Sequence, residues 1–177
     1  PSRGDGPGGP TDVGRLTMGK EVWVKVDPWD KGLVTAALEG GADAVMVPPG
    51  FEKEVKKLGL ITVIGPEGDL KPDRDIIQWE IRGREDEEEI IRHSRQKRVI
   101  VRTPDWTVIP LENLVARTEN IVAEVRTREE AQLVAGVLEK GVKCLLVHVS
   151  DPIELREVLR ALKEEEEQLS LVEAEVE

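Results

Sequence analysis

The chain has 177 residues, which suits one domain with a single hydrophobic core. Its formal net charge of −11 and its pI near 4.8 argue against nucleic acid or an anionic membrane as the main partner, because both attract clustered Lys and Arg. Cys144 is the single cysteine, no apolar run reaches the about 20 residues of a membrane span, and no secretion signal opens the chain, so we expect a cytoplasmic protein.

Residues 1–17 are rich in glycine and proline and carry few apolar side chains. Such a composition cannot bury a hydrophobic face, so we expect this segment to be a flexible leader. Residues 18–177 are expected to form a single α/β domain.

From Met18 onward, short β-branched runs alternate with amphipathic stretches, which is typical of βαβ units around a mainly parallel sheet. The expected strands are Val22–Val26, Ala44–Val47, Leu60–Ile64, Ile76–Ile81, Val99–Arg102, Ile121–Val125, Cys144–Val149 and Leu169–Val176. The expected helices are Lys31–Glu39, Phe51–Leu58, Glu85–Arg95, Pro110–Arg117, Arg128–Lys140 and Pro152–Gln168. Gly65–Asp75 has the composition of a loop at a place where a helix would be expected.

A pattern of helix, glycine and strand occurs twice. Leu38-Glu39-x-Gly41 is followed by Ala44-x-x-Val47, and Leu138-Glu139-x-Gly141 is followed by Cys144-x-x-Val147. This repeat and the eight expected strands favour a compact or incomplete (β/α)8-type barrel, although such barrels usually need roughly 200 residues or more. An open, doubly wound parallel sheet is the alternative.

In either parallel architecture, functional groups lie at the carboxyl ends of the strands. Lys25 and Glu124 lie within or near such ends, where burial could shift their pKa values toward a catalytic range. The lysine could form a Schiff base or act as a base, and the glutamate could move protons. The alternative is that both side chains face the helices or solvent. His148, in an apolar strand, is more typical of a hydrogen-bonded structural residue.

Asp105–Leu114, with the sequence DWTVIPLENL, joins an expected strand to an expected helix. Pro110 suits the first helical position, and Glu112 suits the positive end of the helix dipole. Polar groups at such a junction are candidates for chemistry, while Trp106 and Leu111 could simply be core. No glycine-rich dinucleotide or phosphate motif follows a strand, and the cysteine and histidine spacing predicts no metal site.

This segment closely resembles the most distinctive part of class II 3-dehydroquinate synthases, the NAD-dependent type best known from archaea. Further similar segments follow in the family's order, so that the resemblance covers about residues 20–177. They include Glu21–Val24, Val34–Glu39, Ile121–Val125, Glu130-Ala131, Leu138–Gly141 and Leu169–Val176.

The resemblance implies an enzyme that oxidises the amine-bearing carbon of 2-amino-3,7-dideoxy-D-threo-hept-6-ulosonate with NAD. Release of ammonia and ring closure would then give 3-dehydroquinate for aromatic amino-acid biosynthesis. We expect the catalytic residues among Lys25, Asp105, Glu112, Asn113 and Glu124; the NAD contacts are not assigned and no metal is expected.

Members of this family continue beyond the segment equivalent to Leu169–Val176 into a glycine-rich second half. We therefore expect this chain to act as a homo-oligomer or by docking to such a half. The alternatives are a non-catalytic α/β module that assembles with a partner, a related aminohydroxybenzoate-forming enzyme, and a small barrel aldolase or lyase that uses Lys25.

Overall fold

The computed structural model describes residues 21–106, 108, 109, 111–138 and 144–176. In this part of the chain, seven parallel strands form one sheet in the order β3-β2-β1-β7-β6-β5-β4. The strands are β1 (Glu21–Lys25), β2 (Ala44–Met46), β3 (Thr62–Ile64), β4 (Ile76–Glu80), β5 (Arg98–Arg102), β6 (Ile121–Val125) and β7 (Cys144–Val147). The helices are α2 (Lys31–Glu39), α3 (Glu52–Leu58), α4 (Arg84–His93), α5 (Leu111–Val115), α6 (Arg128–Leu138) and α7 (Pro152–Val176).

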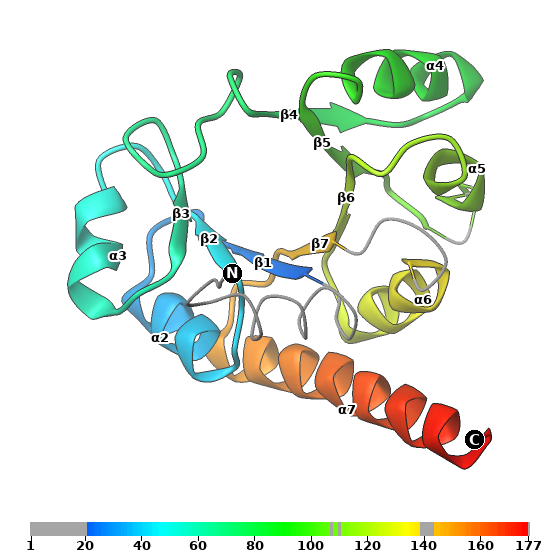
Figure 1. The fold of residues 1–177 in the computed structure, drawn as a ribbon. Helices are drawn as coiled ribbons and strands as arrows, with labels where there is room; N and C mark the ends of the chain where they lie inside the picture. Colours follow the sequence, from blue (N-terminus) through cyan, green and yellow to red (C-terminus); the bar gives the residue numbers. More distant parts are fainter. Residues whose placement is uncertain (1–20, 107, 110, 139–143, 177) are drawn as a thin grey trace, which may run out of the picture.

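The sheet is curled into an incomplete α/β barrel with the helices around its outside (Figure 1). The last strand, β7, pairs with the first strand, β1, as in a closed barrel. Along the sheet, the connections from β1 to β3 and from β4 to β7 all step in one direction. Because such crossovers are right-handed, this order places the helices on one face of the sheet. The incomplete barrel is therefore confirmed, and the doubly wound sheet, with helices on both faces, is not.

The expected eighth strand at Leu169–Val176 is wrong, because these residues belong to α7, which continues to Val176. The alternation of apolar and polar residues there favoured a strand. However, no glycine or proline interrupts the chain after Pro152, and Leu, Glu, Lys, Ala and Gln all have high helix propensity. The described barrel therefore has seven strands, and its opening lies between β3 and β4.

Gly65–Asp75 connects the two edge strands across this opening and contains no helix, as the sequence predicted. Asp69 attaches the loop to the free edge of β3. Its carboxylate accepts the Val63 N–H at 2.9 Å, and its own N–H donates to the Val63 carbonyl at 2.7 Å. The hydrogen bond from Lys56 lowers the pKa of Asp69. The loop thus satisfies backbone groups that an edge strand would otherwise leave unpaired.

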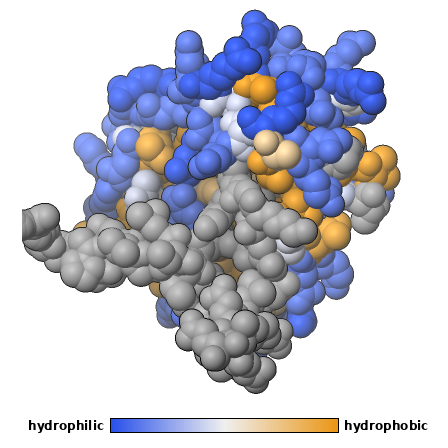
Figure 2. Space-filling model, turned by 45° about the vertical axis from the view of Figure 1, so that its right-hand side comes forward, coloured by the Kyte–Doolittle hydropathy of each residue, from blue (hydrophilic) through white to orange (hydrophobic). Residues whose placement is uncertain are grey.

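The two faces of the sheet share one hydrophobic core. Alternate residues of each strand point into the barrel, so Trp23 and Lys25 lie on one face of β1. Trp23 is fully buried, and so is Leu146, its partner on β7. Cys144 is also buried, and burial raises the pKa of its thiol. On the face seen in Figure 2, hydrophilic residues predominate among the described residues, with hydrophobic patches between them.

At the start of α6, the Thr127 hydroxyl accepts the N–H of Glu130 at 3.0 Å, and the Glu130 carboxylate accepts the N–H of Arg126 at 2.8 Å. The expected leader and the second glycine of the repeat, Gly141, lie outside the described residues. No helix of the described ranges is both long and apolar enough to cross a membrane.

Glu52 is a buried carboxylate that joins two loops at the carboxyl ends of β2 and β3. It accepts the N–H groups of Gly50 and Glu67, each at 2.9 Å. A Cβ at Gly65 would lie 2.7 Å from a Glu52 oxygen, so only glycine leaves room for this contact. Burial raises the pKa of Glu52, but the backbone N–H groups of Glu67, Gly50 and Glu52 itself, together with the charge of Lys71, outweigh burial and lower it overall.

Glu52→Gln is expected to reduce the free energy of unfolding by about 1–3 kcal/mol, because an amide NH2 would face one of the two N–H donors. The lowered pKa means that the ionised carboxylate stabilises the fold above the ordinary glutamate pKa, near 4.5, and that this contribution is lost on acidification. Urea unfolding at pH 7 and at pH 4 measures both effects. A Glu54→Gln variant of the same helix is the control, and an equal loss in both variants would contradict the assignment.

Candidate functional site

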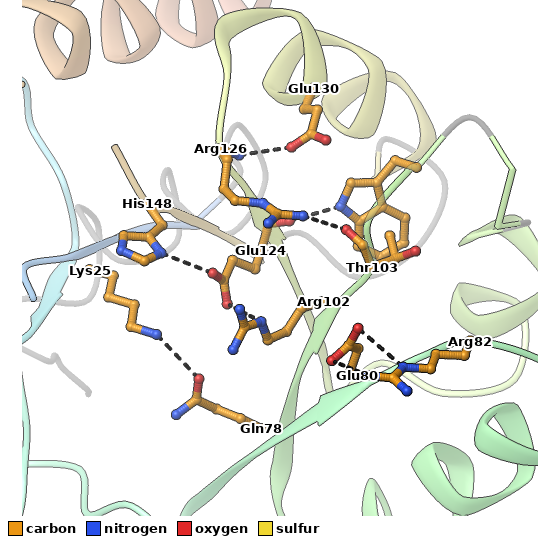
Figure 3. Close-up of polar contacts among 11 residues, drawn as sticks. Lys25, Gln78, Glu80, Arg82, Arg102, Thr103, Glu124, Arg126, Glu130 and His148 are labelled. Atoms are coloured by element: carbon orange, nitrogen blue, oxygen red, sulfur yellow. Dashed lines mark hydrogen bonds and ion pairs between the residues drawn. The ribbon is translucent and has the colours of Figure 1, made fainter. Parts of the chain in front are cut away.

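Polar side chains from five strands meet at one mouth of the barrel (Figure 3). The carboxyl ends of parallel strands lie at the same end of such a barrel, which is where active sites of this architecture are found. Lys25 ends β1, Arg102 ends β5, Glu124 lies near the end of β6, and His148 follows β7. Gln78 reaches the group from β4, on the far side of the mouth.

Glu124 and His148 form the central pair of the site. Nδ1 of His148 lies 3.1 Å from Oε2 of Glu124, whose side chain is 1% exposed, while that of His148 is 30% exposed. If Nδ1 donates to the carboxylate, Nε2 of the neutral ring carries the lone pair and can accept a proton. The pair therefore has the arrangement of a base held in position by a carboxylate.

Positive charge surrounds the Glu124 carboxylate. Burial raises the pKa of Glu124, but the hydrogen bond from His148 and the charges of Lys25 and Arg102 outweigh burial and lower it overall. Arg102 Nε lies 3.8 Å from Oε1 of Glu124. Lys25 Nζ lies 3.4 Å from the Gln78 amide oxygen, so a neutral group rather than a carboxylate contacts the lysine there. The carboxylate is thus ionised at neutral pH.

The segment Asp105–Leu114 contacts the backbone of Glu124 through one buried side chain. The indole N–H of Trp106 donates to the Glu124 carbonyl at 2.8 Å, and the Trp106 ring is buried. Arg126 donates to the Thr103 carbonyl at 2.6 Å, which joins the loop after β5 to the end of β6. The prediction of Trp106 and Leu111 as core is confirmed, because both are nearly fully buried.

Of the five predicted catalytic residues, the structure brings Lys25 and Glu124 together at the mouth. Glu112 and Asn113 are exposed in the first turn of α5, and Asp105 is exposed before it. Their catalytic role stays a prediction.

Sequence reasoning did not select two members of the group, Arg102 and His148, as catalytic residues, and it interpreted His148 as a structural residue. Both residues could have been found from the strand pattern, in which every second side chain faces the same side of the sheet. Arg98, Ile100 and Arg102 share one face of β5, and Cys144, Leu146 and His148 share one face of the run that contains β7. Once Glu124 is placed inside the barrel, the register of β6 with β7 also places His148 beside it.

Other polar groups at the mouth contact each other. Glu80 accepts from Arg82 Nε and from its terminal nitrogen, both at 3.3 Å, so the charge of Glu80 is matched. In the described part of the chain, no group of three or more His, Cys, Asp or Glu side chains is arranged to hold a metal ion.

Comparisons with known proteins agree on one family. The family model described as the 3-dehydroquinate synthase II N-terminal domain matches residues 19–162. A 3-dehydroquinate synthase from Methanoculleus marisnigri is 48% identical over 81% of this chain and 43% of its own length. A 3-dehydroquinate synthase homolog from Aquifex aeolicus is 47% identical over 86% of this chain and 46% of its own length. The chain thus spans about half the length of these curated relatives.

A solved structure confirms the architecture. The crystal structure of mutually generated monomers of dimeric phosphoribosylanthranilate isomerase from Thermotoga maritima matches with a TM-score of 0.58, covering 81% of this chain and 98% of that chain. With 11% sequence identity, this likeness concerns the barrel fold alone.

Proposed function

Because the chain belongs to the 3-dehydroquinate synthase II family through its N-terminal domain, we propose that it forms the barrel part of a 3-dehydroquinate synthase and carries the acid–base groups of the reaction. The observation that carries this proposal is the Glu124–His148 pair at the carboxyl ends of the barrel strands. The substrate would be the amino-dideoxy-heptulosonate implied by the family.

This reaction needs proton transfer at two stages. An amine-bearing carbon gives up hydride readily only when its ammonium group has lost a proton, and ring closure needs a proton removed from the carbon next to the ketone. His148 Nε2, oriented by Glu124, can accept a proton at either stage. Hydrolysis of the resulting imine releases ammonia and leaves a ketone, which is the acceptor for ring closure.

The hydride acceptor implied by the family is NAD. Its pyrophosphate would suit a helix N-terminus with free N–H groups. At α2, however, the Asp30 carboxylate already accepts the Gly32 N–H at 2.8 Å. Acidic residues in the first turn of the other described helices would repel a pyrophosphate; they are Glu52, Glu54, Glu85, Asp86, Glu87, Glu112, Glu129, Glu130 and Glu154. The described helix ends do not fit NAD, and the proposal assigns no cofactor contact to them.

The test measures NADH absorbance and 3-dehydroquinate by mass spectrometry. The chain is assayed with the amino-sugar acid and NAD, alone and mixed with the C-terminal half of the Methanoculleus marisnigri relative. We expect both products in the mixture. The C-terminal half alone is the control, and it should form neither. Absence of product from the mixture, while the intact relative is active in the same buffer, would overturn the proposal.

A further inference from the structure

One oxygen of the central carboxylate lacks a hydrogen bond. Glu124 Oε2 contacts His148, but Oε1 is buried and receives no hydrogen bond from the described residues. Arg102 Nε, at 3.8 Å, is too distant for one. Leaving a buried, ionised oxygen without a donor destabilises the free protein, so a ligand that brings an N–H to this position would remove that penalty.

The same mouth has an excess of positive charge. Arg102 and Lys25 both act on Glu124, and Arg102 is 42% exposed, so its guanidinium is within reach of a ligand. Glu80 does not balance these charges, because Arg82 binds it with two hydrogen bonds. The site therefore offers one acceptor for a cation and two cations for an anion.

We infer that this mouth recognises the α-amino carboxylate group of the substrate, with Glu124 Oε1 accepting from the ammonium group and Arg102 and Lys25 binding the carboxylate. In an α-amino acid, the two charged groups are attached to one carbon, which matches a carboxylate oxygen and a guanidinium that lie 3.8 Å apart. This inference rests on the proposed function and assigns substrate groups to residues of that site.

The assignment explains why Glu124 contacts His148 through only one oxygen. Oε1 would fix the substrate nitrogen, while Oε2 keeps His148 in position to accept a proton close to the same nitrogen. A ligand with a carboxylate but no amine would leave Oε1 without a donor. A ligand with an amine but no carboxylate would leave Arg102 and Lys25 unmatched. Both kinds of ligand should bind more weakly than the amino acid.

Three seven-carbon probes separate these cases: 2-aminoheptanoate, heptanoate and 1-aminoheptane. Binding to the chain is followed by NMR of the histidine ring signals. The chain has only two histidines, and His93 lies on α4, so its signal is an internal reference. We expect 2-aminoheptanoate to shift His148 but not His93, and to bind about tenfold or more tightly than either of the other probes.

Single substitutions test which residue binds the ammonium group of the ligand and which binds its carboxylate. Glu124→Gln should weaken binding of 2-aminoheptanoate about tenfold and change that of heptanoate less than about twofold, which also shows that the variant is folded. Arg102→Met should weaken binding of both carboxylates. The matched control combines Arg82→Met with Glu80→Gln, which removes the neighbouring pair without freeing a charge at the mouth, and it should change neither.

Equal binding of heptanoate and 2-aminoheptanoate, a Glu124→Gln variant with unchanged preference, or no shift of His148 with any probe would overturn the inference. These results are distinguishable from failure of the proposed function. If 3-dehydroquinate forms but 2-aminoheptanoate is not preferred over the other probes, only the assignment of substrate groups to residues is disproved. If 2-aminoheptanoate is preferred but no 3-dehydroquinate forms, the proposed function is disproved and the site remains one that binds amino acids.

Discussion

Replacing Glu124 with glutamine is expected to lower kcat for 3-dehydroquinate formation by about 10²–10⁴-fold, the range typical of a positioned acid–base group. The reason is geometric as well as electrostatic. An amide at this position can present its NH2 group to His148 Nδ1, which favours the tautomer with its proton on Nε2. His148 would then be unable to accept a proton from the substrate, although the shape of the site would be almost unchanged.

The measurement is the initial rate of NADH formation in the mixture with the C-terminal half of the relative. Glu80→Gln is the matched control, because Glu80 lies at the same mouth but contacts Arg82 rather than His148. Thermal unfolding of both variants separates a catalytic loss from a folding loss. A Glu124→Gln variant with more than about a tenth of the original kcat would show that the pair is structural.

Much of the fold follows from patterns in the sequence. Short β-branched runs separated by amphipathic stretches predicted the parallel sheet. The short chain counted against a full barrel and left an incomplete barrel among the alternatives. Leu169–Val176 was misassigned because an alternation over eight residues fits a strand, whereas the helix there continues from Pro152 without a helix-breaking residue. Local periodicity alone does not show where a long helix ends.

The site was predictable only in part. Lys25 and Glu124 stood out as charged residues within apolar strands, which is costly unless they are paired or functional. Arg102 and His148 gave a weaker signal, because their role depends on which face of the strand points into the barrel. Trp106 is the clearest case: its hydrogen bond to the Glu124 carbonyl joins residues 18 positions apart, and only the packing of β5 against β6 creates it.

The segment Asp105–Leu114 contains polar residues that are exposed in the structure. Glu112 and Asn113 looked like site residues because they belong to the segment that most resembles the family. In the structure they are exposed on a short helix outside the sheet. The described part of the segment contacts the site through Trp106, so a structural reason exists for this similarity whether or not the exposed residues act in catalysis.

Trp23 is the residue whose loss should destabilise the fold most. Its side chain is fully buried inside the barrel, two residues before Lys25 on the same face of β1. The indole N–H donates to Glu21 at 3.1 Å, and the Arg98 guanidinium lies 5.4 Å from the ring centroid. Arg98 also pairs with Glu21 at 3.0 Å. The ring therefore fills the layer beneath the site and contacts a charged pair.

Trp23→Ala is expected to reduce the free energy of unfolding by about 3–5 kcal/mol, the usual cost of deleting a buried aromatic ring and leaving a cavity. Denaturant unfolding measures this loss. Trp23→Phe keeps most of the apolar bulk and should lose less of the free energy of unfolding. Trp79→Ala, at a partly buried ring on β4, is the matched control. Because Lys25 lies directly above this layer, the alanine variant should also weaken 2-aminoheptanoate binding, whereas the phenylalanine variant should largely retain it. Equal stability of the Trp23→Ala and Trp79→Ala variants would show that Trp23 does not fill the barrel interior, and the placement of Lys25 above it would then be wrong as well.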